Sequence, residues 1–233
     1  MKKITILLSL IVFIGLTIII SLFSIENESC YAQVKKQKLD KKRIEWELSV
    51  IKDLTNPERP QWALDLAVQY DLSESIDMVI AVYTDLLLND PYYTVRKSAA
   101  EGLGHIGDKR AAPALKNAIE DSLVEVRIEA AGALVKLGIS NDDKIFSTLE
   151  YFVRGKNIDT WNVRISFLEN MTEEEREIYK NNHVQSIRKK AMTCIADINL
   201  PKTKSLLEDM TKDPNEIIRK WAEKLLKEKF VKK

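Results

Sequence analysis

Apolar side chains recur along this chain at spacings of three and four residues, the period of an amphipathic α-helix. Short polar turns rich in Asp, Asn, Gly and Pro interrupt the pattern, which then starts again. The stretch from Leu39 to Leu54 shows the first such face, with Ile44, Leu48 and Ile51 on one side. The pattern therefore predicts an all-α chain of paired helices, without strands, between Leu39 and Phe230.

The clearest internal repeat lies between Asp90 and Gly138. Each matched Asp, Val, Arg, Ala and Leu of the first copy recurs 31 residues later in the second. Self-similarity at such a period predicts a solenoid, in which each helix pair packs on the next. Fainter copies cover 41–70 and 182–230, and an irregular copy lies near Asn162. We expect about six helix pairs in one domain over residues 41–230.

An aspartate in the turn of each clear copy stands six residues before an arginine. Such an aspartate can accept the free N–H groups that open the following helix. The arginine lies almost two turns further on, and its donors can reach the turn of the adjoining repeat. Asn182 takes the aspartate position before Arg188. The expected structural row comprises Asp90, Arg96, Asp121, Arg127, Arg188, Asp213 and Arg219.

A second set of positions, spaced by four residues, lies beside the core positions of the helices that carry the arginines. Charged side chains dominate it, together with two isoleucines that we expect to have no core to enter. We interpret these positions as a partner-binding stripe. Its members are Lys97, Glu101, His105, Ile128, Lys136, Ile165, Glu169, Lys189, Asp197 and Lys220.

The motif Asp-x5-Arg with Val before the Arg, followed by Ala-Ala-x-x-Leu-Gly-x-Ile-Gly-Asp, resembles HEAT repeats. The short, alanine-rich period resembles the subtype named for phycobilisome lyases. This resemblance implies a right-handed α-solenoid, a superhelix whose Val-Arg helices line the concave face. It also implies a protein-binding scaffold, since most members of that fold are scaffolds. The chain shows no distinctive acidic or aromatic chromophore site, so lyase activity is not carried over.

The first 32 residues have the layout of a targeting segment. Lys2 and Lys3 precede an uncharged apolar run over 4–25, and Cys30-Tyr31-Ala32 resembles a signal-peptidase site. The run is long enough to span a bilayer, so an uncleaved membrane anchor through 4–25 is the alternative to a cleaved signal. The basic residues between Lys35 and Arg43 favour a cytoplasmic location instead. We expect export, with residues 33–40 as a solvated linker.

Composition and residue spacing argue against several classes of function. The 36 basic and 35 acidic residues leave a net charge of +1, so no global basic field exists to recruit nucleic acid. His105 and His183 lack metal-ligand partners at helical spacing, and neither Cys30 nor Cys194 pairs with a catalytic base. We therefore expect no enzymatic activity, no metal and no cofactor.

The sequence thus predicts an exported, non-enzymatic scaffold that binds a protein or peptide on its concave face. Two alternatives stay open. One is an enzyme or bilin-lyase-like subunit that shares the repeat, and the other is a membrane-anchored cytoplasmic adaptor. The pattern predicts neither the identity of the partner nor the oligomeric state.

Overall fold

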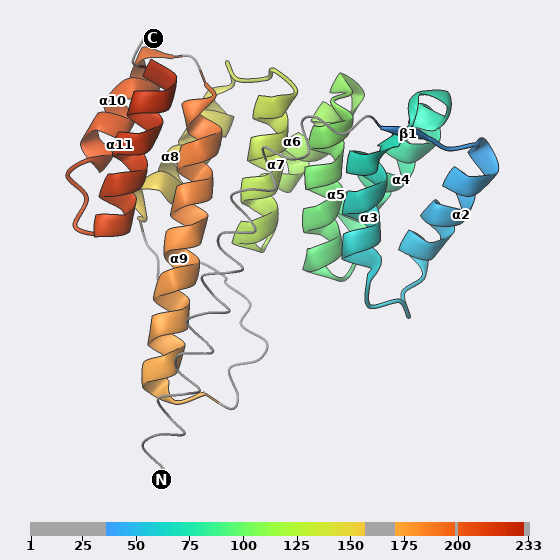
Figure 1. Ribbon diagram of the computed structural model, residues 1–233, viewed down its shortest axis with the longest axis horizontal. Coiled ribbons are helices and arrows are strands. Elements are labelled where there is room, and N and C mark those ends of the chain that lie inside the picture. The colour runs from blue at the N-terminus through green and yellow to red at the C-terminus, as the bar shows by residue number, and fades with distance from the viewer. Residues whose placement is uncertain (1–35, 157–170, 199, 231–233) are drawn as a thin grey trace.

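The computed structural model describes residues 36–156, 171–198 and 200–230. These residues form an all-α helical-repeat solenoid, which Figure 1 shows as a row of helices running from α2 to α11. The inner helices α3, α5, α7, α9 and α11 pack side by side, and an outer helix precedes each of them. The ten α-helices of the described residues are α2 (Lys41–Lys52), α3 (Arg59–Gln69), α4 (Ile76–Asn89), α5 (Tyr93–Ile106), α6 (Ala112–Ala118), α7 (Val124–Lys136), α8 (Asp143–Arg154), α9 (Glu173–Ala196), α10 (Pro201–Met210) and α11 (Glu216–Phe230).

The repeated apolar positions form one continuous core between the two layers. On α5 these positions are Val95, Ala99 and Leu103, all at most 1% exposed. Their counterparts on α7, 31 residues later, are equally buried. Each fully buried Val or Leu contributes about 1.5–3 kcal/mol, while the alanines let neighbouring helices approach closely.

Turn chemistry ends and begins the helices where the sequence predicts. Gly107 and Gly138 each follow an inner helix with φ of 76°, a conformation in which a side chain would be strained. Pro60 and Pro113 lie in the first turns of α3 and α6, where a missing N–H costs least. The first helix is shorter than expected, because Asp40 caps it and Leu54 lies beyond its end, exposed.

Two short strands correct the expectation of a chain without strands. β1 (Gln37–Lys38) pairs in parallel with β2 (Tyr70–Asp71), directly after α3. In addition, Lys36 donates to the carbonyl of Ala67 at 3.1 Å. Residues 36–40 of the expected linker therefore lie against the end of α3. The expected signal or anchor, residues 1–32, lies outside the described residues.

Five helix pairs lie among the described residues, where about six were expected over the whole of 41–230. The irregular copy near Asn162 lies outside them. Inner helix α9 packs directly against α7 and against outer helix α8, so α8 and α9 make one pair. A Cβ on Gly132 of α7 would stand 2.8 Å from Cys194 Sγ of α9, which shows how closely the two helices approach.

Helix α9 is a single helix of 24 residues and projects beyond its neighbours (Figure 1). Thr172 and Glu175 form a reciprocal capping box at its start. The expected turn at Asn182 is wrong, because Asn182 lies within α9. Physically, no Gly or Pro interrupts 173–196, so the polar first half continues into the apolar second half.

Candidate functional site

The first feature of the inner helices is a set of arginine–aspartate pairs between neighbouring repeats. Arg96 of α5 donates through Nε to Asp121 Oδ2 at 2.8 Å and through Nη2 to Asp121 Oδ1 at 3.0 Å. Asp121 also accepts the backbone N–H of Leu123 at 2.9 Å, just before α7 begins. One aspartate thus joins the start of its own helix to the repeat before it.

A second pair, Arg188 of α9 with Asp213, is more deeply buried. The two side chains are 6% and 7% exposed, and both guanidinium Nη atoms reach the carboxylate. Arg188 Nε also donates to the carbonyl of Val153 at 3.0 Å, at the end of α8. The side chain therefore links α8, α9 and the turn before α11.

Sequence reasoning missed a third pair, Arg59 with Asp90. Both side chains are 2% exposed, and Arg59 Nε donates to the carbonyl of Ile51 at 2.5 Å. Arg59 stands in the first turn of α3, with Asp53 six residues earlier but with Glu58 instead of Val before it. The available signal was the spacing from Asp53 to Arg59, although the partner of Arg59 is Asp90, 31 residues later.

Two members of the predicted row make different contacts. Arg127 Nε donates to the carbonyl of Ile119 at 3.2 Å, and its guanidinium lies 5.1 Å from the Phe152 ring centre. Arg219 donates to the carbonyls of Asp213 and Pro214 in its own turn. Among the described residues, neither arginine reaches an aspartate of an adjoining repeat.

The expected partner-binding stripe needs one clear correction. Ile128 is only 2% exposed, so it belongs to the core of α7 and not to a solvent-facing surface. The interval of 31 residues carried the stripe from α5 to α7, but the same position is half-buried on α5 and buried on α7. Ile165 and Glu169 lie outside the described residues.

Three stripe residues of α5 lie half-buried next to a charged cluster on α7 and α9. Glu129 of α7 is 5% exposed and forms an ion pair with Lys190 of α9. Burial, and then the nearby Glu129 carboxylate, raises the pKa of Glu101. Burial, and then the ammonium of Lys136, lowers the pKa of His105 to about 4. Unlike a fully solvated histidine, His105 is thus partly desolvated and neutral at pH 7.

The α9–α11 end of the stripe is more open. Asp197 and Lys220 are exposed, and they pair with Lys229 and Glu216 respectively, both at 2.6 Å. Lys189 is half-buried, and its ammonium lies 4.5 Å from the ring centre of Trp221. We define the inner-helix face as the stripe residues that the structure leaves at least partly exposed: Lys97, Glu101, His105, Lys136, Lys189, Asp197 and Lys220.

Sequence reasoning also missed the acidic partners on α7. Glu125 Oε1 lies 3.1 Å from His183 Nε2 of α9, and Glu129 pairs with Lys190. Both glutamates are buried, which charge alone does not indicate. The two glutamates are four residues apart on α7, and their partners, His183 and Lys190, are seven residues apart on α9. This spacing indicates the two pairs only once the helices are known to be neighbours.

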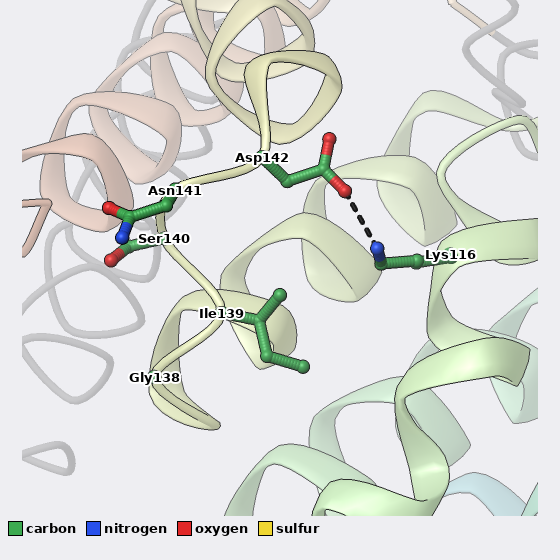
Figure 2. Close-up of a pocket in the computed structure, with 6 residues that line it drawn as sticks. All are labelled: Lys116, Gly138, Ile139, Ser140, Asn141 and Asp142. Atoms are coloured by element: carbon green, nitrogen blue, oxygen red, sulfur yellow. Dashed lines mark ion pairs between the residues drawn. The ribbon is translucent and has the colours of Figure 1, made fainter.

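The outer side of the molecule carries a shallow hollow of about 490 Å³, shown in Figure 2. Lys116 and Asp142 face each other across it at 2.8 Å, and Asp142 also caps α8. Its two charged side chains neutralise each other, so the hollow offers no unpaired charge. Over 36–156, 171–198 and 200–230, no group of three or more His, Cys, Asp or Glu side chains is placed to hold a metal ion.

Among the described helices, none combines the length and the apolar composition that crossing a membrane requires. This finding does not bear on 4–25, which lies outside the described residues.

Comparison with known proteins identifies the repeat. The family description of HEAT repeats matches residues 80–153, which contain α5, α6, α7 and most of α4 and α8. This segment is similar to HEAT repeats. HEAT repeats generally mediate protein–protein interactions and are commonly non-catalytic. The phycobilisome-lyase subtype is not singled out by this match.

Two solved structures are similar at low identity. An engineered protein from the Northeast Structural Genomics Consortium shares 19% identity, with 77% of each chain covered and a TM-score of 0.37. A designed armadillo repeat protein shares 16% identity, with 78% of this chain and 98% of that chain covered and a TM-score of 0.35. Comparison with curated proteins gives no match.

Proposed function

We propose that this HEAT-repeat chain is an exported, non-enzymatic scaffold that holds a protein or peptide on the concave side of a right-handed superhelix. The observation that supports this proposal is the inner-helix face, on which charged side chains continue from α5 across α7 to α9 and α11. Pairs such as Lys190 with the buried Glu129 hold these helices together, so the face is rigid before a partner arrives. Preorganisation lowers the entropic cost of binding.

The proposal is tested by photocrosslinking from both sides of the molecule. A benzophenone amino acid replaces Lys136, on the inner-helix face, or Lys116, on outer helix α6; both side chains are exposed. In cells, we expect a discrete protein adduct from position 136 and none from position 116. Adducts from position 116 alone would place the partner on the outer side and refute the assignment.

Export is part of the proposal and rests on the sequence of residues 1–32. We expect a mature chain that begins at or near Gln33, outside the cytoplasm. Intact-mass measurement of protein from envelope fractions distinguishes the alternatives. A mass that retains 1–32 favours a membrane anchor through 4–25, and protease protection of the C-terminal repeats in the cytoplasm contradicts export.

A further inference from the structure

Trp221 of α11 is held between the inner helices by a short chain of hydrogen bonds. Its indole Nε1 donates to Thr193 Oγ1 of α9 at 3.2 Å. The Thr193 hydroxyl in turn donates to the carbonyl of Lys189 at 3.0 Å. The orientation of the ring is therefore set by α9, although the residue belongs to α11.

Two ammonium groups gather at this one ring. Lys189 Nζ of α9 and Lys224 Nζ of α11 each lie 4.5 Å from a ring centre of Trp221. A cation over an indole is attracted by the negative face of the ring. Such contacts orient the two lysines, but they leave both positive charges in place.

The charge of Lys189 lacks the compensation that Lys190 and Lys220 have. Lys190 pairs with Glu129, and Lys220 pairs with Glu216. Across the part of the chain that the structure describes, no carboxylate lies within ion-pair distance of Lys189. Burial, and then the charge of Lys224, lowers the pKa of Lys189, so a negative group placed here would relieve an unfavourable environment.

We propose that Lys189 and Lys224, oriented by Trp221, bind a side-chain carboxylate in an acidic segment of a protein partner. The inference rests on the proposed scaffold function and specifies the chemistry of its partner. A carboxylate bound here would accept hydrogen bonds from both ammonium groups, and the exposed part of the indole would contact the adjacent apolar atoms.

Local charge favours a short acidic peptide over a nucleic acid or an anionic membrane. Glu228 lies 3.8 Å from Lys224, and Glu216 and Asp197 pair with two other lysines of α11, Lys220 and Lys229. Acids on these two helices would repel a continuous row of phosphates more than a single carboxylate. The chain as a whole has a net charge of only +1, too little for affinity that depends on phosphate neutralisation.

The test measures binding of fluorescein-labelled hexaglutamate to the full chain in nonionic detergent at low salt. We expect binding, and about a tenfold loss of affinity in Lys189→Gln, which removes the charge and keeps most of the side chain. Lys204→Gln on outer helix α10 is the control, since it removes one lysine charge from the outer layer of helices, where Lys204 pairs with Glu208. We expect it to bind like the wild type, and hexaglutamine to bind to none of the proteins.

An independent readout comes from the indole N–H resonance of Trp221, assigned by its disappearance in Trp221→Phe. Hexaglutamate should shift this resonance in the wild type and in Lys204→Gln, but not in Lys189→Gln. Absence of binding, or equal affinity of the two lysine variants, overturns the inference. Tighter binding of oligothymidylate or of phosphatidylserine vesicles at the same site overturns it in favour of another partner class.

The two proposals fail in different ways. If Lys189→Gln leaves hexaglutamate binding unchanged while crosslinks from position 136 persist, the scaffold proposal stands and the acidic-partner inference falls. If crosslinks arise only from position 116, the scaffold face is wrong even when hexaglutamate binds.

Discussion

Replacing Arg188 by alanine tests whether the buried arginine–aspartate pairs hold the repeats in register. The change leaves Asp213 charged and 9% exposed, with the backbone N–H of Asn215 still donating to it at 2.9 Å. It also leaves the carbonyl of Val153 without the guanidinium donor at 3.0 Å. Both losses occur where α8, α9 and α11 meet.

The magnitude follows from burial. Breaking a buried ion pair from one side costs about 3–5 kcal/mol, because the remaining charge has no counter-ion. An unsatisfied buried carbonyl costs about 1–3 kcal/mol, and the two losses overlap because one side chain provides both. We expect Arg188→Ala to lower the free energy of unfolding by about 3–5 kcal/mol, a large part of the total stability of a typical domain.

Urea unfolding followed by circular dichroism provides the measurement, with two comparison variants. Arg96→Ala removes a pair whose side chains are 13% and 11% exposed, so we expect a smaller loss of about 1–3 kcal/mol. Arg154→Ala removes pairs with Glu150 and Asp209 at the surface, which are worth about 0–1 kcal/mol.

Arg188→Lys sharpens the test. A lysine keeps the charge, but its compact ammonium cannot reach the Val153 carbonyl and both carboxylate oxygens together. We expect it to recover only part of the lost stability. Unfolding midpoints that coincide for Arg188→Ala and Arg154→Ala would refute the reasoning, because burial would then have no effect on how much the ion pair contributes to stability.

Three further predictions concern the inner helices. Gly132→Ala places a Cβ 2.8 Å from Cys194 Sγ and should cost about 1–3 kcal/mol in urea unfolding, with partial recovery in the double variant Gly132→Ala/Cys194→Ala. Ile128→Asp should lower stability by more than about 3 kcal/mol, since a carboxylate would enter the core. A melting temperature equal to that of the wild type would contradict the assignment of Ile128 to the core. His105 should titrate near pH 4 in NMR, below its ordinary 6.5. Because the unfolded chain then binds a proton that the folded chain does not, His105 lowers stability as pH falls from 6.5 towards 4, and His105→Gln should weaken that pH dependence.

The repeat architecture was predictable because it depends on local chemistry. Asp in the turn, Gly after the helix and Val, Ala and Leu at helical spacing each act within one repeat, so two clear copies between Asp90 and Gly138 suffice to predict the fold. The same local chemistry accounts for the proline in the first turn of α6 and for the cap of α8 at Asp142.

The register of the surface was less predictable, because it depends on which helices become neighbours. Ile128 occupies the same position on α7 as Lys97 on α5. On α5 the position is half-buried, but on α7 it is in the core. The interval of 31 residues carries no information about this difference, since burial depends on which parts of the chain pack against each helix.

Between Arg127 and Arg188, the distance along the sequence does not predict which helices are neighbours in space. These arginines are 61 residues apart in sequence, which suggested an intervening repeat, yet α7 and α9 are in contact. Two polar pairs, Glu125–His183 and Glu129–Lys190, cross that contact, and Gly132 permits the close approach. Buried polar partners are costly unless both are present, so these side chains favour this neighbour over another. The α7–α9 junction therefore owes its specificity to charged residues, whereas α5 and α7 approach closely at Gly104, where a Cβ would stand 3.0 Å from that of Ala133. This explains why periodicity alone predicted one junction and missed the other.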